Sequence, residues 1–159
     1  GKEYYENEPV LAGAWERLEA AARACAERGF VFGYHNHAFE LEISVGGRRL
    51  LDAILEGAPS VAAEIDACWV YAGGADPAEY IRKYRGRVPL VHLKDMVRGE
   101  DGRPDTVELG RGEVDLKAIA AAAADAGAEW LIVEQDRCAN PPLESVAVSI
   151  GWLRDNGLR

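Results

Sequence analysis

Four short apolar runs alternate along the chain with longer segments in which apolar residues recur at helical spacing. The apolar runs predict β-strands at residues 30–37, 61–66, 88–93 and 130–134. The segments with helical spacing are residues 9–28, 49–56, 77–85, 115–126 and 142–156. One helix followed by four strand–helix units predicts an α/β fold, in which parallel strands are joined by right-handed crossovers.

Residues that favour helix ends mark several of these boundaries. Gly29 follows the first helical segment and is typical of a helix C-terminus. Asp76 and Pro77 are a suitable N-cap and first residue for the third helix. Residues 94–112 are rich in glycine and charge and predict a long polar loop after the third strand. The fourth strand is nearly all apolar, which is typical of a strand buried on both faces.

Composition and charge limit the possible functions. The 159 residues are 48% hydrophobic, which predicts a single domain over residues 1–159 with its own core. The net charge of −9 argues against binding to nucleic acid, because phosphate contacts need a basic surface. No apolar run approaches the roughly 20 residues of a membrane helix, and no secretory signal opens the chain. With three widely spaced cysteines, Cys25, Cys68 and Cys138, the sequence predicts a cytoplasmic protein with reduced thiols.

Polar side chains stand at the carboxyl ends of the predicted strands, where reacting groups collect in α/β proteins. They are His35, Asp66, His92 and Glu134. His37 is expected on the same face as His35, because side chains alternate along a strand. Two imidazoles and two carboxylates suit Mn²⁺, Co²⁺ or Zn²⁺. Taken singly, Asp66 has alternative roles as a helix cap or ion-pair partner, and Glu134 as a partner of Arg137; their shared position favours a site.

Five segments resemble, in order, the motifs of the sugar phosphate isomerase/epimerase family, a group of xylose isomerase-like (β/α)₈ barrels. They are residues 33–40 (GYHNHAFE), 64–70 (EIDACWV), 91–96 (VHLKDM), 108–115 (ELGRGEVD) and 133–137 (VEQDR). The resemblance covers essentially the whole chain. Because a complete barrel takes about 250 residues and eight strands, the resemblance implies a parallel βα repeat that forms the four-stranded, C-terminal half of a TIM barrel.

The resemblance also implies a metal held by glutamate, aspartate, histidine and glutamate from four successive strands. Asp66, His92 and Glu134 match these ligands in type, and His35 stands where many relatives have a glutamate. His37 is the alternative ligand or a substrate contact. The ion that the resemblance implies is Mn²⁺, Mg²⁺, Co²⁺ or Zn²⁺.

Substrate contacts are expected from the loop after the third strand and from an aromatic residue. Lys94 and Arg98 are placed to hold a hydroxyl or a phosphate, with a solvated charge as the alternative for both. Trp69 either stacks on a sugar face or fills the core. The partner that the resemblance implies is therefore a sugar or a sugar phosphate.

The chemistry that the resemblance implies is proton abstraction next to a carbonyl, through a metal-stabilised enediolate. Glu134 is expected to bind the metal and to serve as a base, and His37 is the second candidate for proton transfer. With His35 in place of a glutamate one carboxylate is lost, which argues against a symmetrical two-base epimerisation and leaves isomerisation, dehydration or cleavage of a keto-sugar open.

The alternative function is that of a catalytically inactive half-barrel, which keeps the metal-site motifs and serves as an assembly module. A half-barrel leaves two open sheet edges and an uncovered inner face, which favour association. The sequence therefore predicts a homodimer or a companion half-barrel.

Overall fold

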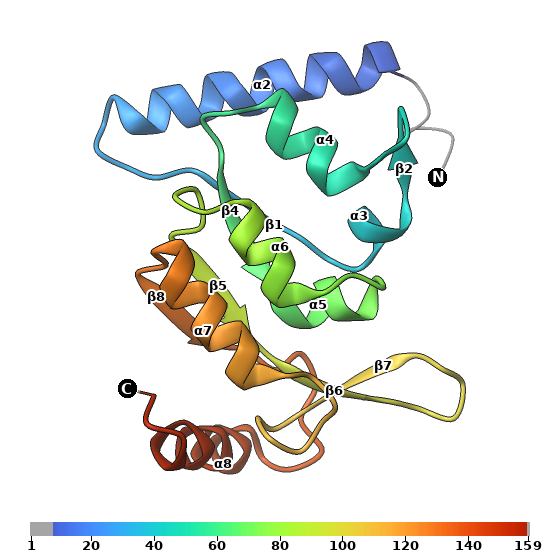
Figure 1. Ribbon diagram of the computed structural model, residues 1–159, viewed down its shortest axis with the longest axis vertical. Helices are drawn as coiled ribbons and strands as arrows, with labels where there is room; N and C mark the ends of the chain where they lie inside the picture. The colour runs from blue at the N-terminus through green and yellow to red at the C-terminus, as the bar shows by residue number, and fades with distance from the viewer. Residues whose placement is uncertain (1–7, 159) are drawn as a thin grey trace.

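The computed structural model describes residues 8–158, and its centre is a parallel sheet with the strand order β1-β4-β5-β8 (Figure 1). These strands are β1 (Gly33–His35), β4 (Ala62–Asp66), β5 (Leu90–Leu93) and β8 (Trp130–Val133). The predicted set of four parallel strands is confirmed. The sheet does not close within the described part of the chain, as expected for half of a (β/α)₈ barrel.

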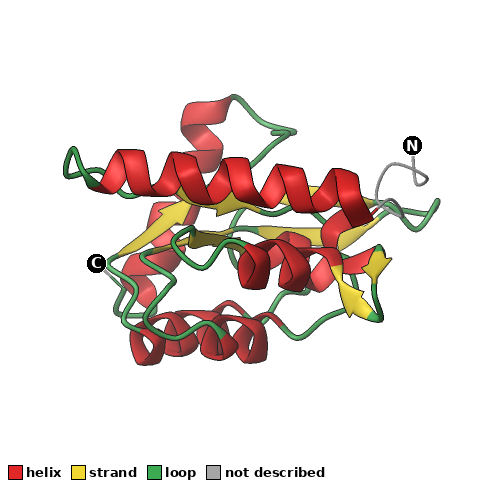
Figure 2. Ribbon diagram, turned by 90° about the horizontal axis from the view of Figure 1, so that it is seen from above, coloured by secondary structure: helices red, strands yellow, loops and turns green. Residues whose placement is uncertain are grey.

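The five predicted helices all form, with ends within two residues of the expected ones. They are α2 (Glu8–Ala26), α4 (Leu50–Gly57), α6 (Pro77–Lys83), α7 (Leu116–Ala126) and α8 (Pro142–Asp155). Asp76 caps α6 as expected, since its carboxylate accepts the N–H of Glu79 at 2.9 Å. Helix α2 crosses one end of the molecule beside α4 (Figure 1), and Figure 2 looks at the molecule from that end.

Several short elements lie where the sequence predicts loops or continued strands. They are α3 (Phe39–Glu42), α5 (Ala67–Ala72), the hairpin of β2 (Ser44–Val45) and β3 (Arg48–Arg49), and the hairpin of β6 (Asp95–Arg98) and β7 (Pro104–Val107). The long loop predicted at residues 94–112 is therefore wrong for most of its length. The chain turns back between Gly99 and Gly102, where a φ of +75° at Gly102 suits glycine. The β6–β7 strands then pair in antiparallel register.

The first strand is shorter than the predicted range of residues 30–37. Phe30 and Val31 are 68% and 75% exposed and lie before the paired segment. After His35 the chain leaves the sheet, because the buried Asn36 side chain hydrogen-bonds in both directions with the backbone of Asp66, at 3.0 and 3.2 Å. His37 therefore lies in the turn before α3 rather than in the strand.

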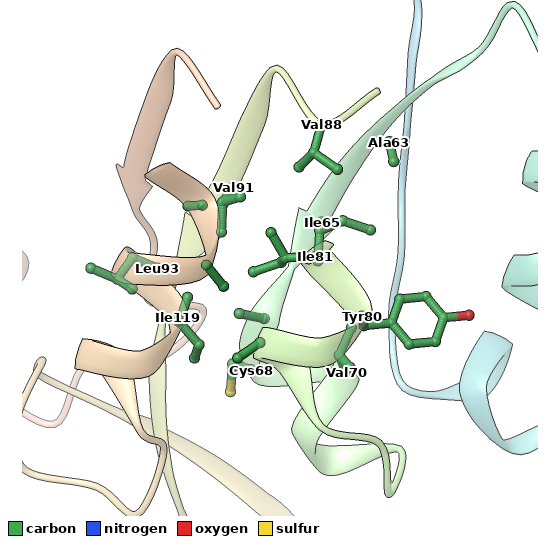
Figure 3. Packing of buried hydrophobic residues seen from close by; sticks show 14 of the residues in the cluster. Ala63, Ile65, Cys68, Val70, Tyr80, Ile81, Val88, Val91, Leu93 and Ile119 are labelled. Carbon is green, nitrogen blue, oxygen red and sulfur yellow. The ribbon is translucent and has the colours of Figure 1, made fainter. Parts of the chain in front are cut away.

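The core lies between one face of the sheet and the helices that cover it (Figure 3). Alternate strand residues point into it, among them Ile65, Val91 and Leu93, and they meet Ile81 of α6 and Ile119 of α7. The other face is covered less completely: Trp130 is 63% exposed and Ile132 is 39% exposed. The expectation that the fourth strand is buried on both faces is wrong for this face.

Two further sequence-based expectations bear on the fold. Cys25, Cys68 and Cys138 are free thiols, and burial raises the pKa of Cys68, which leaves it unreactive in the core. From residue 8 to residue 158, the helices are too short or too polar to cross a bilayer.

A carboxylate joins α4 to the end of α6. Asp52 accepts hydrogen bonds from the hydroxyls of Tyr80 and Tyr84 at Oδ1, and Lys83 Nζ lies 2.8 Å from Oδ2. Burial acts to raise the pKa of Asp52, but the hydrogen bonds from Lys83, Tyr80 and Tyr84 outweigh it and hold the pKa below its usual value. Ionised Asp52 therefore stabilises the fold.

We expect Asp52→Asn to lower the free energy of unfolding by about 1–3 kcal/mol near neutral pH, because three donors lose a charged acceptor. Since the pKa of Asp52 is lowered in the folded chain, its contribution is present above the unfolded pKa of about 3.9 and is lost as the pH falls. The difference between wild type and variant in urea unfolding should therefore shrink from about pH 7 to about pH 3.

The matched control is Asp125→Asn, which breaks the exposed ion pair between Asp125 and Arg82. This variant should change the free energy of unfolding by less than about 1 kcal/mol at either pH. Equal losses in the two variants would contradict a special role for Asp52.

Candidate metal site

The carboxyl ends of the four parallel strands meet at one edge of the sheet, and their polar side chains converge there. His35 and Asp66 are the last residues of β1 and β4, His92 is the third residue of β5, and Glu134 directly follows β8. One ligand atom from each of these four side chains lies within 4.8 Å of every other. The structure therefore brings together the four residues that the sequence predicts as metal ligands.

Asp66 is the buried centre of this group. Its Oδ2 lies 3.4 Å from His35 Nε2 and 2.9 Å from Lys94 Nζ, and its Oδ1 accepts the N–H of Trp69 at 3.0 Å as the N-cap of α5. Burial acts to raise the pKa of Asp66, but the nearby imidazoles of His35 and His92 and the charge of Lys94 outweigh it. The pKa of Asp66 is consequently far below its usual value, and the carboxylate is ionised.

His92 lies among three carboxylates, two of them near Nδ1 and one near Nε2. Nδ1 is 2.6 Å from Glu134 Oε2 and 3.7 Å from Asp66 Oδ2, and Nε2 is 2.9 Å from Glu64 Oε1. The nearby carboxylate of Asp66 raises the pKa of His92, as do the hydrogen bond to Glu134 and its charge, against the opposing effect of burial. Burial also acts to raise the pKa of Glu134, but Lys94 and then His92 lower it below its usual value.

Lys94 is fully buried, whereas the sequence predicts it in an open loop. Its Nζ lies 2.9 Å from Asp66 Oδ2, 2.9 Å from Glu134 Oε2 and 2.8 Å from Asp136 Oδ2. Burial acts to lower the pKa of Lys94, but the charges of these three carboxylates, in ion pairs with Nζ, raise it above its usual value. Lys94 is therefore a buried cation inside the cluster, and the contact with substrate stays a prediction.

Aromatic side chains stand beside the cluster. The ring of His37 is 5.0 Å from that of His35 and 6.2 Å from the rings of Trp69 and Phe39, measured between centroids. His37 is exposed, and its backbone N–H donates to Glu40 Oε2 at 2.8 Å. Trp69 lies between this histidine and Lys94, whose Nζ is 5.1 Å from its ring. These rings form a wall at the edge of the site.

Among the described residues, the contacts given for Arg98 are with side chains outside the histidine–carboxylate group. It is exposed on β6, with Nε 3.5 Å from Glu113 Oε1 and the guanidinium 5.9 Å from the Tyr71 ring. Among the described residues its recorded partners thus belong to α5 and to the loop before α7. Its predicted contact with a substrate phosphate stays a prediction.

The cluster has the ligand types and the charge that a divalent ion requires. The formal charges of Asp66, Glu134, Asp136 and Glu64 against that of Lys94 leave three negative charges when the imidazoles are neutral. Two nitrogen and two oxygen ligands suit Mn²⁺, Co²⁺ or Zn²⁺ better than Mg²⁺, which prefers oxygen ligands and water. His35, Asp66, His92 and Glu134 therefore fit the ion that the motifs imply.

Three residues of the site are absent from the sequence-based prediction. Glu64 contacts His92, Asp136 contacts Lys94, and Asn36 fixes the backbone of Asp66. Glu64 had a signal, because it lies two residues before Asp66 and therefore on the same face of β4. Asp136 and Asn36 lie outside the strands, where alternation gives no guide to direction.

Proteins of known sequence or structure resemble this chain. Inosose dehydratase of Geobacillus kaustophilus (strain HTA426) is 32% identical over 105 residues, which cover 62% of this chain and 31% of that protein. A sugar phosphate isomerase/epimerase from Parabacteroides distasonis ATCC 8503 matches with a TM-score of 0.79 and 24% identity, over 94% of this chain and 53% of that one. A probable 3-DHS dehydratase from Bacillus anthracis matches with a TM-score of 0.72 and 13% identity, over 93% and 58%.

The chain thus spans about half the length of these solved structures and about a third of the curated relative. The family model of the xylose isomerase-like TIM barrel matches residues 2–156. This match covers almost the whole chain and agrees with the half-barrel sheet and with the resemblance that the five motifs carry. The chain belongs to the xylose isomerase-like TIM barrel family.

Proposed function

We propose that this half-barrel supports metal-dependent proton transfer next to the carbonyl of a sugar or sugar phosphate, in an isomerisation, an epimerisation or a related dehydration. The observation that carries the proposal is the set of four ligand atoms, one from each strand end, within 4.8 Å of one another. The comparisons support the substrate class, because the proteins similar to this chain include an inosose dehydratase and a sugar phosphate isomerase/epimerase.

A divalent ion held by His35, Asp66, His92 and Glu134 would act as a Lewis acid that polarises the carbonyl and stabilises negative charge as the proton leaves. The protein supplies the geometry. Asn36 holds the backbone of Asp66, and the N–H of Trp69 holds its Oδ1. Lys94 contacts the carboxylates of both Asp66 and Glu134 and so keeps their separation constant. Ligands fixed in this way require little rearrangement when the ion binds.

His37 is the better candidate of the two for proton transfer. Glu134 Oε2 already contacts His92 and Lys94, and its lowered pKa makes it a weaker base. His37 is exposed at the edge of the cluster, beside His35. We assign metal binding to Glu134 and proton transfer to His37.

Substrate binding is assigned to the residues around this edge. Trp69 offers a ring on which the apolar face of a sugar can stack. Arg98, exposed on β6, offers a guanidinium to a phosphate. Lys94 has no exposed surface, so a direct contact with Lys94 requires the substrate to reach the carboxylate cluster itself.

The metal site is tested by titrating metal-free protein with Co²⁺ in a calorimeter. We expect about one ion per chain and a loss of roughly 100-fold or more in affinity for Asp66→Asn. The loss of a direct metal ligand should lower the affinity at least as much as the loss of a residue that only orients a ligand. Asparagine is preferred to alanine because it keeps an acceptor for the α5 cap. Asp76→Asn makes the same change at the cap of α6 and should bind Co²⁺ as the wild type does. Equal affinity in wild type and Asp66→Asn would exclude the cluster as the ion site.

Proton transfer is tested by following the exchange of the C–H next to the carbonyl in D₂O, by proton NMR, with Mn²⁺-loaded protein and a panel of ketoses and inososes. We expect His37→Asn to slow the exchange by about 10²- to 10⁴-fold, the usual contribution of a general base, and to leave Mn²⁺ affinity unchanged. His35→Asn, two residues away, should lower both. Undiminished exchange in His37→Asn would transfer the role to Glu134.

The second candidate function is that of an assembly module without catalysis. It is favoured by the exposed Trp130 and Ile132 on the inner face and by the outer edges of β1 and β8, which pair with no strand in the described part of the chain. In a closed barrel this face is filled by side chains from all strands. A second half-barrel, either another copy or a companion segment, would cover both features at once.

Sedimentation velocity at micromolar concentration tests this association. We expect a dimer for the wild type and a monomer for Trp130→Glu, because a charge at a buried apolar contact is strongly unfavourable. Arg103→Glu also introduces a carboxylate but lies at the tip of the β6–β7 hairpin, and it should remain dimeric. A wild-type monomer would contradict association between copies. Metal binding without C–H exchange would favour the module over the enzyme.

A further inference from the structure

Glu64 lies in the middle of β4 and is half-buried on the same face as Asp66. In the parallel register Asp66 is opposite His92 of β5, and Glu64 is opposite Leu90. Glu64 is therefore the diagonal neighbour of His92 and reaches its ring from the side away from the strand ends. Its Oε1 is 2.9 Å from His92 Nε2.

The two nitrogens of His92 face different surroundings. Nδ1 faces the cluster, at 2.6 Å from Glu134 and 3.7 Å from Asp66, and Nε2 faces Glu64. A histidine that binds a metal through one nitrogen usually donates its other N–H to a carboxylate or a carbonyl. This bond fixes the tautomer and the ring orientation, and it makes the metal-binding nitrogen more basic.

We propose that Glu64 is the positioning residue of the metal site: it accepts the Nε2–H of His92 and so presents Nδ1 to the ion. This inference rests on the proposed metal site and gives a role to Glu64, which opens the motif at residues 64–70 but is not one of the four ligands. Glu64 acts through His92 and does not touch the ion.

Two other roles for Glu64 fit the geometry less well. As a direct ligand, it would have to reach the ion from the Nε2 side of the ring, and it is not part of the group whose ligand atoms lie within 4.8 Å of one another. As a partner of the buried cation it is not needed, because Lys94 already contacts Asp66, Glu134 and Asp136. The carboxylate of Glu64 is therefore positioned to contact His92.

The first test is Co²⁺ affinity of the full chain, measured for wild type, Glu64→Ala and Glu64→Gln. We expect Glu64→Ala to bind roughly 10- to 100-fold more weakly, the usual effect of losing such a partner. Glu64→Gln keeps an acceptor of the same shape and should lose less Co²⁺ affinity. This variant also provides the measurement if the alanine variant does not fold. Glu129→Ala removes an exposed carboxylate at the other end of the sheet and should retain wild-type affinity.

The second test identifies the nitrogen of His92 that binds the ion, by NMR of ¹⁵N-histidine in the Zn²⁺-loaded protein. Wild type should show Nδ1 bound and Nε2 protonated, and Glu64→Ala should show a mixture of the two modes. If Glu64→Ala lost affinity while His92 still bound the ion through Nδ1 alone, Glu64 would have only a structural role and the inference would be overturned. Unchanged affinity in both Glu64 variants would overturn it and leave the metal site intact, whereas a wild type that binds no ion would overturn both.

Discussion

The buried ammonium of Lys94 is the constraint on which the strand ends depend. Lys94 follows β5, and its partners Asp66, Glu134 and Asp136 end or follow β4 and β8, so one charge links three strands. Leaving a buried charge without its partners is strongly destabilising, by about 3–5 kcal/mol. These strands therefore cannot slide past one another without a large penalty, and the ligand atoms keep their separations. The same group of charges keeps the site negative overall, as a cation requires.

The fold could be predicted wherever the burial of one face makes apolar residues recur at regular spacing along the sequence. Helices α4, α6 and α7 each bury one stripe, and their ends carry caps such as Asp76 and Gly127, so their positions follow from local patterns. The short helix α5 depends instead on Asp66, whose side chain caps it, and six residues are too few to show a period. The β6–β7 hairpin has mostly polar residues at its exposed positions, so no apolar pattern predicts its strands. They are defined by their antiparallel pairing with each other.

The site was predictable to the extent that parallel strands end at a common edge. This rule places Asp66, His92 and Glu134 together without any knowledge of contacts. The rule does not predict how deeply a residue is buried, however, and a lysine in a polar segment is normally solvated. Asp136, two residues beyond Glu134, lies 2.8 Å from the buried ammonium of Lys94, and this contact depends on the course of the loop after β8. The pairing of Glu64 with His92 likewise depends on the register of two strands distant in sequence.

The depth of Lys94 also divides the molecule into two parts that respond differently to ionic strength. Exposed pairs such as Arg23–Glu19 and Arg103–Asp101 lie in water, where about 1 M salt shortens the screening distance to about 3 Å. Salt also relieves the mutual repulsion that accompanies a net charge of −9. Mobile ions have no access to the fully buried ammonium of Lys94. Concentrated salt therefore screens the outer surface and reaches the partly exposed carboxylates of Glu134 and Asp136, while the fully buried pair of Lys94 and Asp66 is screened much less.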